Sequence, residues 1–200
     1  MGQRSQIYIR YNVKDRYNEK DRKGLIANYY RWNFGERMIS RARGAIEHIA
    51  KNLHYDGYYD QKENSVRLSR IADTNFDMRD VQISCDLVYE WYDEYGGVNF
   101  NDHVFYHQDN NDGRLLIDIN NGVVKYAFLD DKINLENIMD AEGYMRWNNS
   151  PEWRESEYLD EEDVKVCEDN ICYINDHSML MTKEEIEEFL SYNYVVDLFG

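Results

Sequence analysis

The chain has 200 residues, a formal net charge of −16 and 42% hydrophobic residues, which is enough apolar material for the core of a folded globular protein. No apolar run approaches the roughly 20 residues of a membrane-spanning helix, and the N-terminus MGQRSQ lacks the apolar segment of a signal peptide. The three cysteines form no CxxC pair, and the P-loop, GxGxxG, GxSxG and HExxH motifs are all missing. We therefore expect a cytoplasmic protein without a membrane segment, a bound metal or a cofactor.

The charge is distributed unevenly along the sequence. Residues 1–54 carry twelve Lys/Arg and five Asp/Glu, whereas residues 55–200 carry eleven Lys/Arg and thirty-four Asp/Glu. Such asymmetry is typical of proteins that bind nucleic acid or an oppositely charged protein. The alternative is that the two parts complement each other within one fold.

Residues 6–53 predict two strands followed by a helix. QIYIRY at 6–11 and LIANYY at 25–30 are rich in β-branched and aromatic residues, and a charged loop between them indicates an antiparallel hairpin. Residues 36–53 then repeat apolar side chains every three or four positions, as expected of a helix with one face in the core. That face would hold Ile39, Ala42, Ile46, Ile49 and Leu53, and the opposite face would carry a basic stripe of Arg37, Arg41, His48 and Lys51.

The middle of the chain predicts a helix and then an antiparallel meander. Ser84 can cap a helix that continues to Tyr95, where Gly96 and Gly97 end it. Asn121-Gly122 lies between two β-prone runs, which is a strong hairpin signal, so we expect three strands from about His103 to Leu129. The pattern of residues 62–82 does not distinguish a helix from a strand.

The remaining sequence predicts further helices and a second hairpin. Asn134 can cap a helix ending before Pro151, and the seven acids of residues 152–163 indicate either a solvated helix or a linker. Residues 164–174 read as a hairpin, and Thr182 with Glu185 forms a capping box for a last helix. The predicted fold is α+β: an N-terminal β-hairpin packed on a long helix, plus an antiparallel β-meander and flanking helices. Residues 1–150 would form the main domain, with residues 151–200 packed on it or appended to it.

One group of residues could bind an anion. The strand ends and the start of the first helix should converge, and arginines beside a helix N-terminus can bind phosphate or carboxylate groups. The candidates are Arg4, Ser5, Tyr30, Trp32, Asn33, Arg37 and Arg41. In the alternative interpretation, the aromatic residues belong to the core and the arginines pair with the acidic part of the chain.

A second group interleaves carboxylates with aromatic side chains. It comprises Tyr55, Asp56, Tyr58, Tyr59, Asp60, Tyr92, Asp93, Glu94 and Tyr95. Spaced carboxylates can imitate the phosphates of a nucleic acid, and tyrosines provide rigid contact area for a protein partner. An acidic surface can equally serve only to keep the protein soluble.

The N-terminus carries a resemblance to a known group of proteins. The opening M-G-Q-R-S-Q-I, followed after the second strand by Y-Y-R-W-N, resembles phage and mobile-element proteins of low-GC Gram-positive bacteria that open M-G-x-R-S-x-I. The resemblance covers about the first 55 residues and includes LIANYYRWNFGERMISRAR. Several acidic proteins of this size from such elements are anti-CRISPR inhibitors, which block the basic channel of the type II CRISPR nuclease or act on its guide RNA. The basic residues 1–54 depart from the uniformly acidic character of a DNA mimic.

These features lead to two functional hypotheses. In the first, a mobile element encodes the chain as a non-enzymatic inhibitor of a host defence enzyme, which it binds in the bacterial cytoplasm through the acidic, Tyr-rich surface. The resemblance implies the type II CRISPR effector as the partner. In the second, the basic stripe binds or cleaves guide RNA, with His48 as the candidate for proton transfer. Both are compatible with a monomer or a homodimer.

Overall fold

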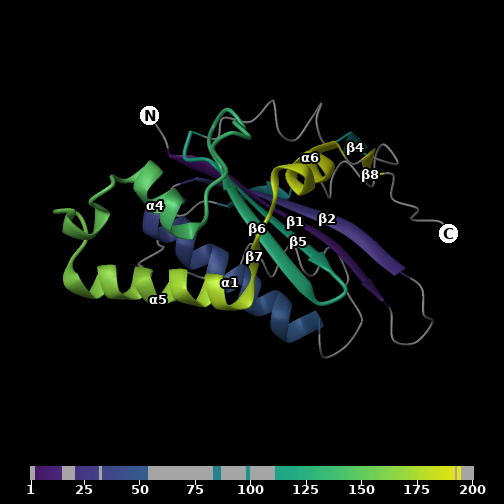
Figure 1. Cartoon of the computed structure of the whole chain (residues 1–200), viewed down its shortest axis with the longest axis horizontal. Coiled ribbons are helices and arrows are strands. Elements are labelled where there is room, and N and C mark those ends of the chain that lie inside the picture. The colour runs from purple at the N-terminus through teal and green to yellow at the C-terminus, as the bar shows by residue number, and fades with distance from the viewer. Residues whose placement is uncertain are drawn as a thin grey trace.

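The computed structural model describes residues 3–14, 21–31, 33–53, 83–86, 98–99, 111–191 and 193–194 (Figure 1). The elements are β1 (Arg4–Lys14), β2 (Asp21–Arg31), α1 (Gly35–Leu53), β3 (Ile83–Asp86), β4 (Val98–Asn99), β5 (Arg114–Asn120), β6 (Val123–Leu129), α4 (Ala141–Asn148), the 3₁₀ helix η2 (Trp153–Glu155), α5 (Glu161–His177), β7 (Met179–Leu180), α6 (Lys183–Ser191) and β8 (Asn193–Tyr194). These elements confirm the predicted α+β class, with an N-terminal hairpin followed by a long helix.

A mixed six-stranded sheet forms the centre of the molecule, in the order β3-β2-β1-β5-β6-β7. The pairs β1–β2 and β5–β6 are antiparallel, whereas β1 and β5 are parallel, with Gln6 opposite Arg114 and Asn12 opposite Asn120. We expected β5 and β6 as strands of an antiparallel meander apart from the N-terminal hairpin; they instead join that hairpin in one sheet, through the parallel pairing of β1 with β5. Strands β1 and β5, at the centre of the sheet, are buried on both faces, as is usual for strands paired in parallel.

The hairpin between β5 and β6 has the predicted turn. Asn121 and Gly122 have φ angles of 48° and 87°, the left-handed conformation that a two-residue hairpin turn requires at both positions. The predicted first strand of the meander, at residues 103–108, lies outside the described residues.

Each face of the sheet is covered by helices and has its own apolar core. Helices α1, α4 and α5 lie on one side and α6 on the other (Figure 1). The first core includes Ile7, Ile9, Met38, Ile39, Ala42, Ile46, Leu115, Ile117, Phe128, Tyr144, Trp153, Cys167, Ile171 and Ile174. The second includes Tyr8, Leu116, Ala127, Leu129, Met181, Ile186 and Phe189. Helix α5 thus packs in the same core as α1.

Helix α5 replaces the hairpin that the sequence predicted for residues 164–174. Cys167, Ile171 and Ile174 are buried and Val164 is partly buried against the same core, so the contacts recur every three or four residues. Asp160 accepts a hydrogen bond from the Asp163 amide at 2.8 Å, and the Asp163 side chain accepts one from the Asp160 amide, which completes a capping box. The β-prone composition of the segment obscured this helical spacing.

Two further helix boundaries differ from the sequence expectation. Helix α4 begins at Ala141, where Asp140 caps it by accepting a hydrogen bond from Gly143, and not after Asn134. Ser84 lies within strand β3, so it does not cap a helix there. By contrast, the Thr182–Glu185 capping box of α6 is confirmed by reciprocal hydrogen bonds of 3.0 and 3.3 Å. Among the described helices, none is long and apolar enough to span a membrane.

Candidate binding site

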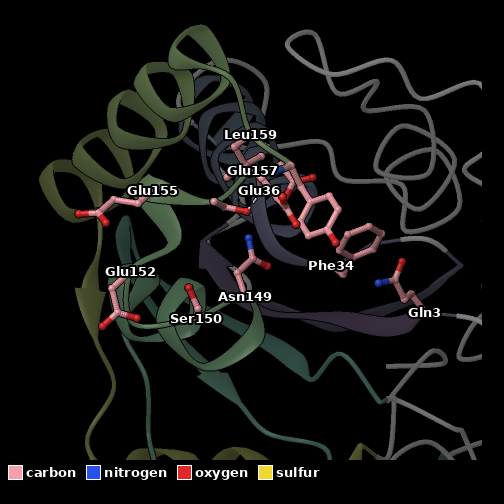
Figure 2. Close-up of a pocket in the computed structure, with 11 residues that line it drawn as sticks. Gln3, Phe34, Glu36, Asn149, Ser150, Glu152, Glu155, Glu157 and Leu159 are labelled. Carbon is pink, nitrogen blue, oxygen red and sulfur yellow. Dashed lines mark hydrogen bonds between the residues drawn. The ribbon is translucent and has the colours of Figure 1, made fainter.

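A cleft of about 750 Å³ lies between the start of α1 and the segment that joins α4 to α5 (Figure 2). It falls within the size range of sites for small ligands or for single side chains of a partner. Its lining combines four glutamates, two aromatic rings and several neutral polar side chains: Gln3, Phe34, Glu36, Asn149, Ser150, Glu152, Glu155, Ser156, Glu157, Tyr158 and Leu159.

Close packing of α1 against Asn149 forms the inner end of the cleft. Gly35 has a φ angle of +47°, and a Cβ atom placed there would lie 2.5 Å from the Asn149 Oδ1 atom. The left-handed backbone favours glycine at this position, and a larger residue would force the Asn149 side chain to move. Glycine at position 35 therefore lets residues more than 100 positions apart build one site.

The outer wall of the cleft is anchored by a buried tryptophan. Trp153 in η2 is fully buried and donates a hydrogen bond from Nε1 to Glu142 at 3.3 Å. The neighbouring Arg154 binds both oxygens of the same carboxylate, at 2.8 and 2.9 Å. These contacts fix η2, so the glutamates on either side of it are held at the cleft.

Glu36 is the most enclosed of the four glutamates. It lies in the first turn of α1, is partly buried and points toward the interior of the cleft beside Asn149 (Figure 2). Burial raises the pKa of Glu36, whereas a backbone hydrogen bond, the charge of Arg37 and a hydrogen bond from Asn149 act in the opposite direction. The net effect is a carboxyl group that ionises less readily than a solvated one.

The rim of the cleft is exposed and contains an unusually accessible aromatic ring. Glu152, Glu155 and Glu157 are exposed, and Tyr158 is 86% exposed. Carboxylates accept hydrogen bonds from cationic donors, and aromatic faces attract the same cations. The arrangement is therefore suited to binding a cationic group. Within the described part of the chain, no group of three or more His, Cys, Asp or Glu side chains is placed to hold a metal ion.

Among the side chains that the structure describes, two members of the predicted anion site contact each other, and both are buried. Ser5 donates a hydrogen bond to the Asn33 carbonyl at 2.7 Å, and the Asn33 amide donates to Ser5 Oγ at 2.8 Å. Both residues have 0% exposure. Their contacts join β1 to the start of α1 inside the protein, so neither side chain faces a ligand at the surface.

The arginines of that predicted site do not form a continuous exposed stripe. Arg41 is only 4% exposed, so its placement on the solvent face of α1 was wrong. Arg37 is partly exposed and its guanidinium lies 5.6 Å from the centre of the Phe34 ring. The backbone amide of Arg4 donates hydrogen bonds to Asn111 and Asp112. The positive charges of this region are thus dispersed and one of them is buried.

Several other predicted site residues lie outside what the structure describes. Tyr30 is in β2 opposite Ser5 and His48 is in α1, but their side chains are not among the described ones, and Trp32 is not described at all. The whole acidic and aromatic group also lies outside the described residues: Tyr55, Asp56, Tyr58, Tyr59, Asp60, Tyr92, Asp93, Glu94 and Tyr95.

One feature of the sequence points to the cleft segment. The seven acids of residues 152–163 predict a solvated helix or a linker, but the segment forms η2 and one wall of the cleft. Trp153, two residues after Pro151, is a large apolar side chain, which favours a segment that turns back onto the core. Glu36 carried no comparable signal, because its part in the cleft depends on the packing of distant segments.

The chain matches no protein-family model, no curated protein and no solved structure.

Proposed function

We propose that the chain is a binding protein, encoded by a mobile element, that inhibits a host nucleic-acid-handling defence enzyme by presenting an acidic surface to that enzyme's basic groove. The observation that carries the proposal is the cleft described above, in which glutamates and aromatic rings line a concave site for cationic groups. The resemblance of the N-terminal residues to mobile-element proteins suggests the type II CRISPR effector of the bacterial host as the enzyme.

The charge of residues 111–191, which supply most of the cleft, supports this kind of partner. They carry 21 Asp/Glu and 7 Lys/Arg, and in α5, which follows the cleft segment, the side chains of Glu161, Glu162 and Glu168 are exposed. A surface of one sign attracts an oppositely charged partner over several ångströms and raises the rate of association. Enzymes that hold nucleic acid must themselves offer such a basic surface.

Part of the positive charge of residues 1–54 is used inside the fold. Arg10 binds Asp118 through two hydrogen bonds of 2.6 and 2.7 Å and also contacts Glu188 at 3.3 Å. Arg43 donates to Asn170 at 2.9 Å and lies over the Tyr173 ring. These contacts favour the interpretation in which the basic and acidic parts complement each other. The burial of Arg41 also takes one of the four predicted members out of the basic stripe on α1, which makes the RNA-binding alternative the less favoured one.

The proposal is tested by adding the purified protein to a reconstituted type II effector with its guide RNA and a target DNA. We expect DNA cleavage to stop at a stoichiometric concentration of the protein while the guide RNA stays intact. A protein variant with Glu152, Glu155 and Glu157 changed to Gln should need a higher concentration for the same inhibition. Full DNA cleavage at saturating protein would overturn the proposal, and cut guide RNA would replace occlusion with RNA cleavage.

A further inference from the structure

We infer that the cleft between the start of α1 and residues 149–159 receives an arginine side chain of the partner protein. The inference rests on the proposed function for the existence of a basic partner, and adds the chemical group that the cleft recognises. Its basis is the combination of a partly buried carboxylate, three rim carboxylates and two aromatic rings in one concave site.

A guanidinium group fits this lining better than an ammonium group does. It is flat, always charged, and presents five N–H donors in a fixed plane, so its edge can bind carboxylates while its face lies on an aromatic ring. Glu36 offers acceptors at the inner end and Tyr158 offers an exposed ring at the rim, while one face of the Phe34 ring already carries the guanidinium of Arg37. A lysine ammonium is a compact charge that cannot satisfy the carboxylates and the rings at once in this way.

The protein binds three of its own arginines in the same manner. Arg10 lies 4.9 Å from the Phe189 ring centre while it binds Asp118. Arg154 lies 4.3 Å from the Trp153 ring while it binds Glu142 and Glu168. Arg43 lies 5.0 Å from the Tyr173 ring and near Glu47. A ring beside a carboxylate is thus the arrangement by which this fold repeatedly holds a guanidinium.

In the cleft, by contrast, the three rim carboxylates are exposed to an outside partner, and Glu36 accepts a hydrogen bond from a neutral side chain, that of Asn149. Among the described residues, no ion pair involves Glu36, Glu152, Glu155 or Glu157. The nearby Arg154 is directed to Glu142 and Glu168. A cation that enters the cleft would form charge-assisted hydrogen bonds with the cleft carboxylates. Arginine is also among the residues that most often anchor protein interfaces.

The test measures the binding of short peptides to the full chain by isothermal titration calorimetry at low salt. The probe is an acetylated, amidated Gly-Arg-Gly-Arg-Gly peptide, compared with versions carrying lysine or citrulline, which is the neutral isostere of arginine. We expect the arginine peptide to bind about tenfold more tightly than the lysine peptide, and the citrulline peptide to show no binding. Equal affinities for arginine and lysine peptides would overturn the inference.

Two variants place the binding in the cleft, and a third provides the matched control. Glu36→Gln keeps the size of the side chain and should weaken binding of the arginine peptide about tenfold, and Tyr158→Ala, at an exposed position, should weaken it about three- to fivefold. Glu187→Gln removes the same charge from α6, on the other face of the sheet, and should change binding less than twofold. Thermal unfolding of each variant confirms that the fold is intact. Equal losses for Glu36→Gln and Glu187→Gln would show only a general attraction to acidic surface and would overturn the inference.

This assay contains no nuclease, so the two proposals fail separately. Arginine-specific binding at the cleft by a protein that leaves the CRISPR effector fully active would overturn the inhibitor proposal and keep the cleft assignment. Inhibition of the effector that is unchanged in the Glu36→Gln and Tyr158→Ala variants would keep the inhibitor proposal and overturn the assignment of the cleft as its arginine receptor.

Discussion

Arg154 binds both carboxylate oxygens of Glu142, with Nη1 to Oε1 at 2.8 Å and Nη2 to Oε2 at 2.9 Å. Glu142 also accepts hydrogen bonds from Arg146 and from the indole of Trp153. This one carboxylate therefore ties α4 to η2 and, through the second contact of Arg154 with Glu168, to α5. The outer wall of the proposed binding cleft depends on this group of contacts.

Stability should depend on pH through Glu142. The hydrogen bond from Arg154 is the largest of the effects that lower its pKa to about 2, so the folded state favours the ionised form. The stabilisation is complete above the pKa of the unfolded state, near 4.3, and is lost as the pH falls toward 2. We expect Glu142→Gln to lower the free energy of unfolding by about 1–2 kcal/mol at pH 7, since the pair is partly solvated, and by less at pH 3. Urea denaturation at both pH values measures this. The same loss of unfolding free energy at pH 3 as at pH 7 would contradict a stabilising role of the ionised Glu142.

Glu36 should have the opposite effect on stability. Burial raises its pKa in the folded protein, so the folded state binds the proton more tightly than the unfolded state does. Stability at this position therefore falls as the pH rises through the unfolded pKa and through the raised folded pKa. We expect Glu36→Gln to raise the urea midpoint at pH 7 and to leave it nearly unchanged at pH 3. A lower midpoint at pH 7 would show that the ionised Glu36 stabilises the fold.

Two glycines with similar backbone angles provide a matched pair for a packing test. Gly113 and Gly122 have φ angles of +84° and +87°, but a Cβ atom at Gly113 would lie 2.6 Å from the Leu129 carbonyl oxygen, whereas one at Gly122 would meet no atom within 4 Å. We expect Gly122→Ala to cost about 1 kcal/mol of stability, from backbone strain alone. Gly113→Ala should cost about 2–4 kcal/mol, because the clash with backbone adds to that strain. Equal losses in chemical denaturation would contradict the close packing of Gly113 on β6.

Arg37 and Arg41 are one helical turn apart, yet they should respond differently to substitution. Arg41 is 4% exposed, so Arg41→Gln replaces a buried charge and should destabilise the protein by about 1–3 kcal/mol. Arg37 is partly exposed, and Arg37→Gln should change stability by less than about 0.5 kcal/mol. Thermal denaturation of the two single variants measures the two changes in stability. Equal, small effects on stability would contradict the burial of Arg41 and would indicate that it lies on the solvent face of α1.

Elements with strong local signals could be predicted from the sequence. The hairpin β1–β2, helix α1, the Asn121-Gly122 turn and the Thr182 cap each follow from residues within a few positions of one another. Helix α5 was missed because its β-branched and aromatic residues suggested strands, although its buried positions keep helical spacing.

Features made by distant parts of the chain could not be predicted in this way. The parallel pairing of β1 with β5 joins segments about 100 residues apart, and the residues of neither strand specify which strand will pair with it. The cleft likewise requires Gly35 to meet Asn149. Arg41 was assigned to the surface because the sequence gives the spacing of α1 but not the number of elements packed around it; α4 and α5 both contact that helix.

The most direct test of the central claim is the salt dependence of the rate at which the protein associates with the type II effector. If the acidic surface steers the encounter, the association rate constant should fall steeply between 50 and about 150 mM salt, because exposed charges are screened beyond a Debye length of roughly 8–10 Å. The dissociation rate constant should change much less. An association rate that is the same at both salt concentrations, or no association at either, would contradict the account.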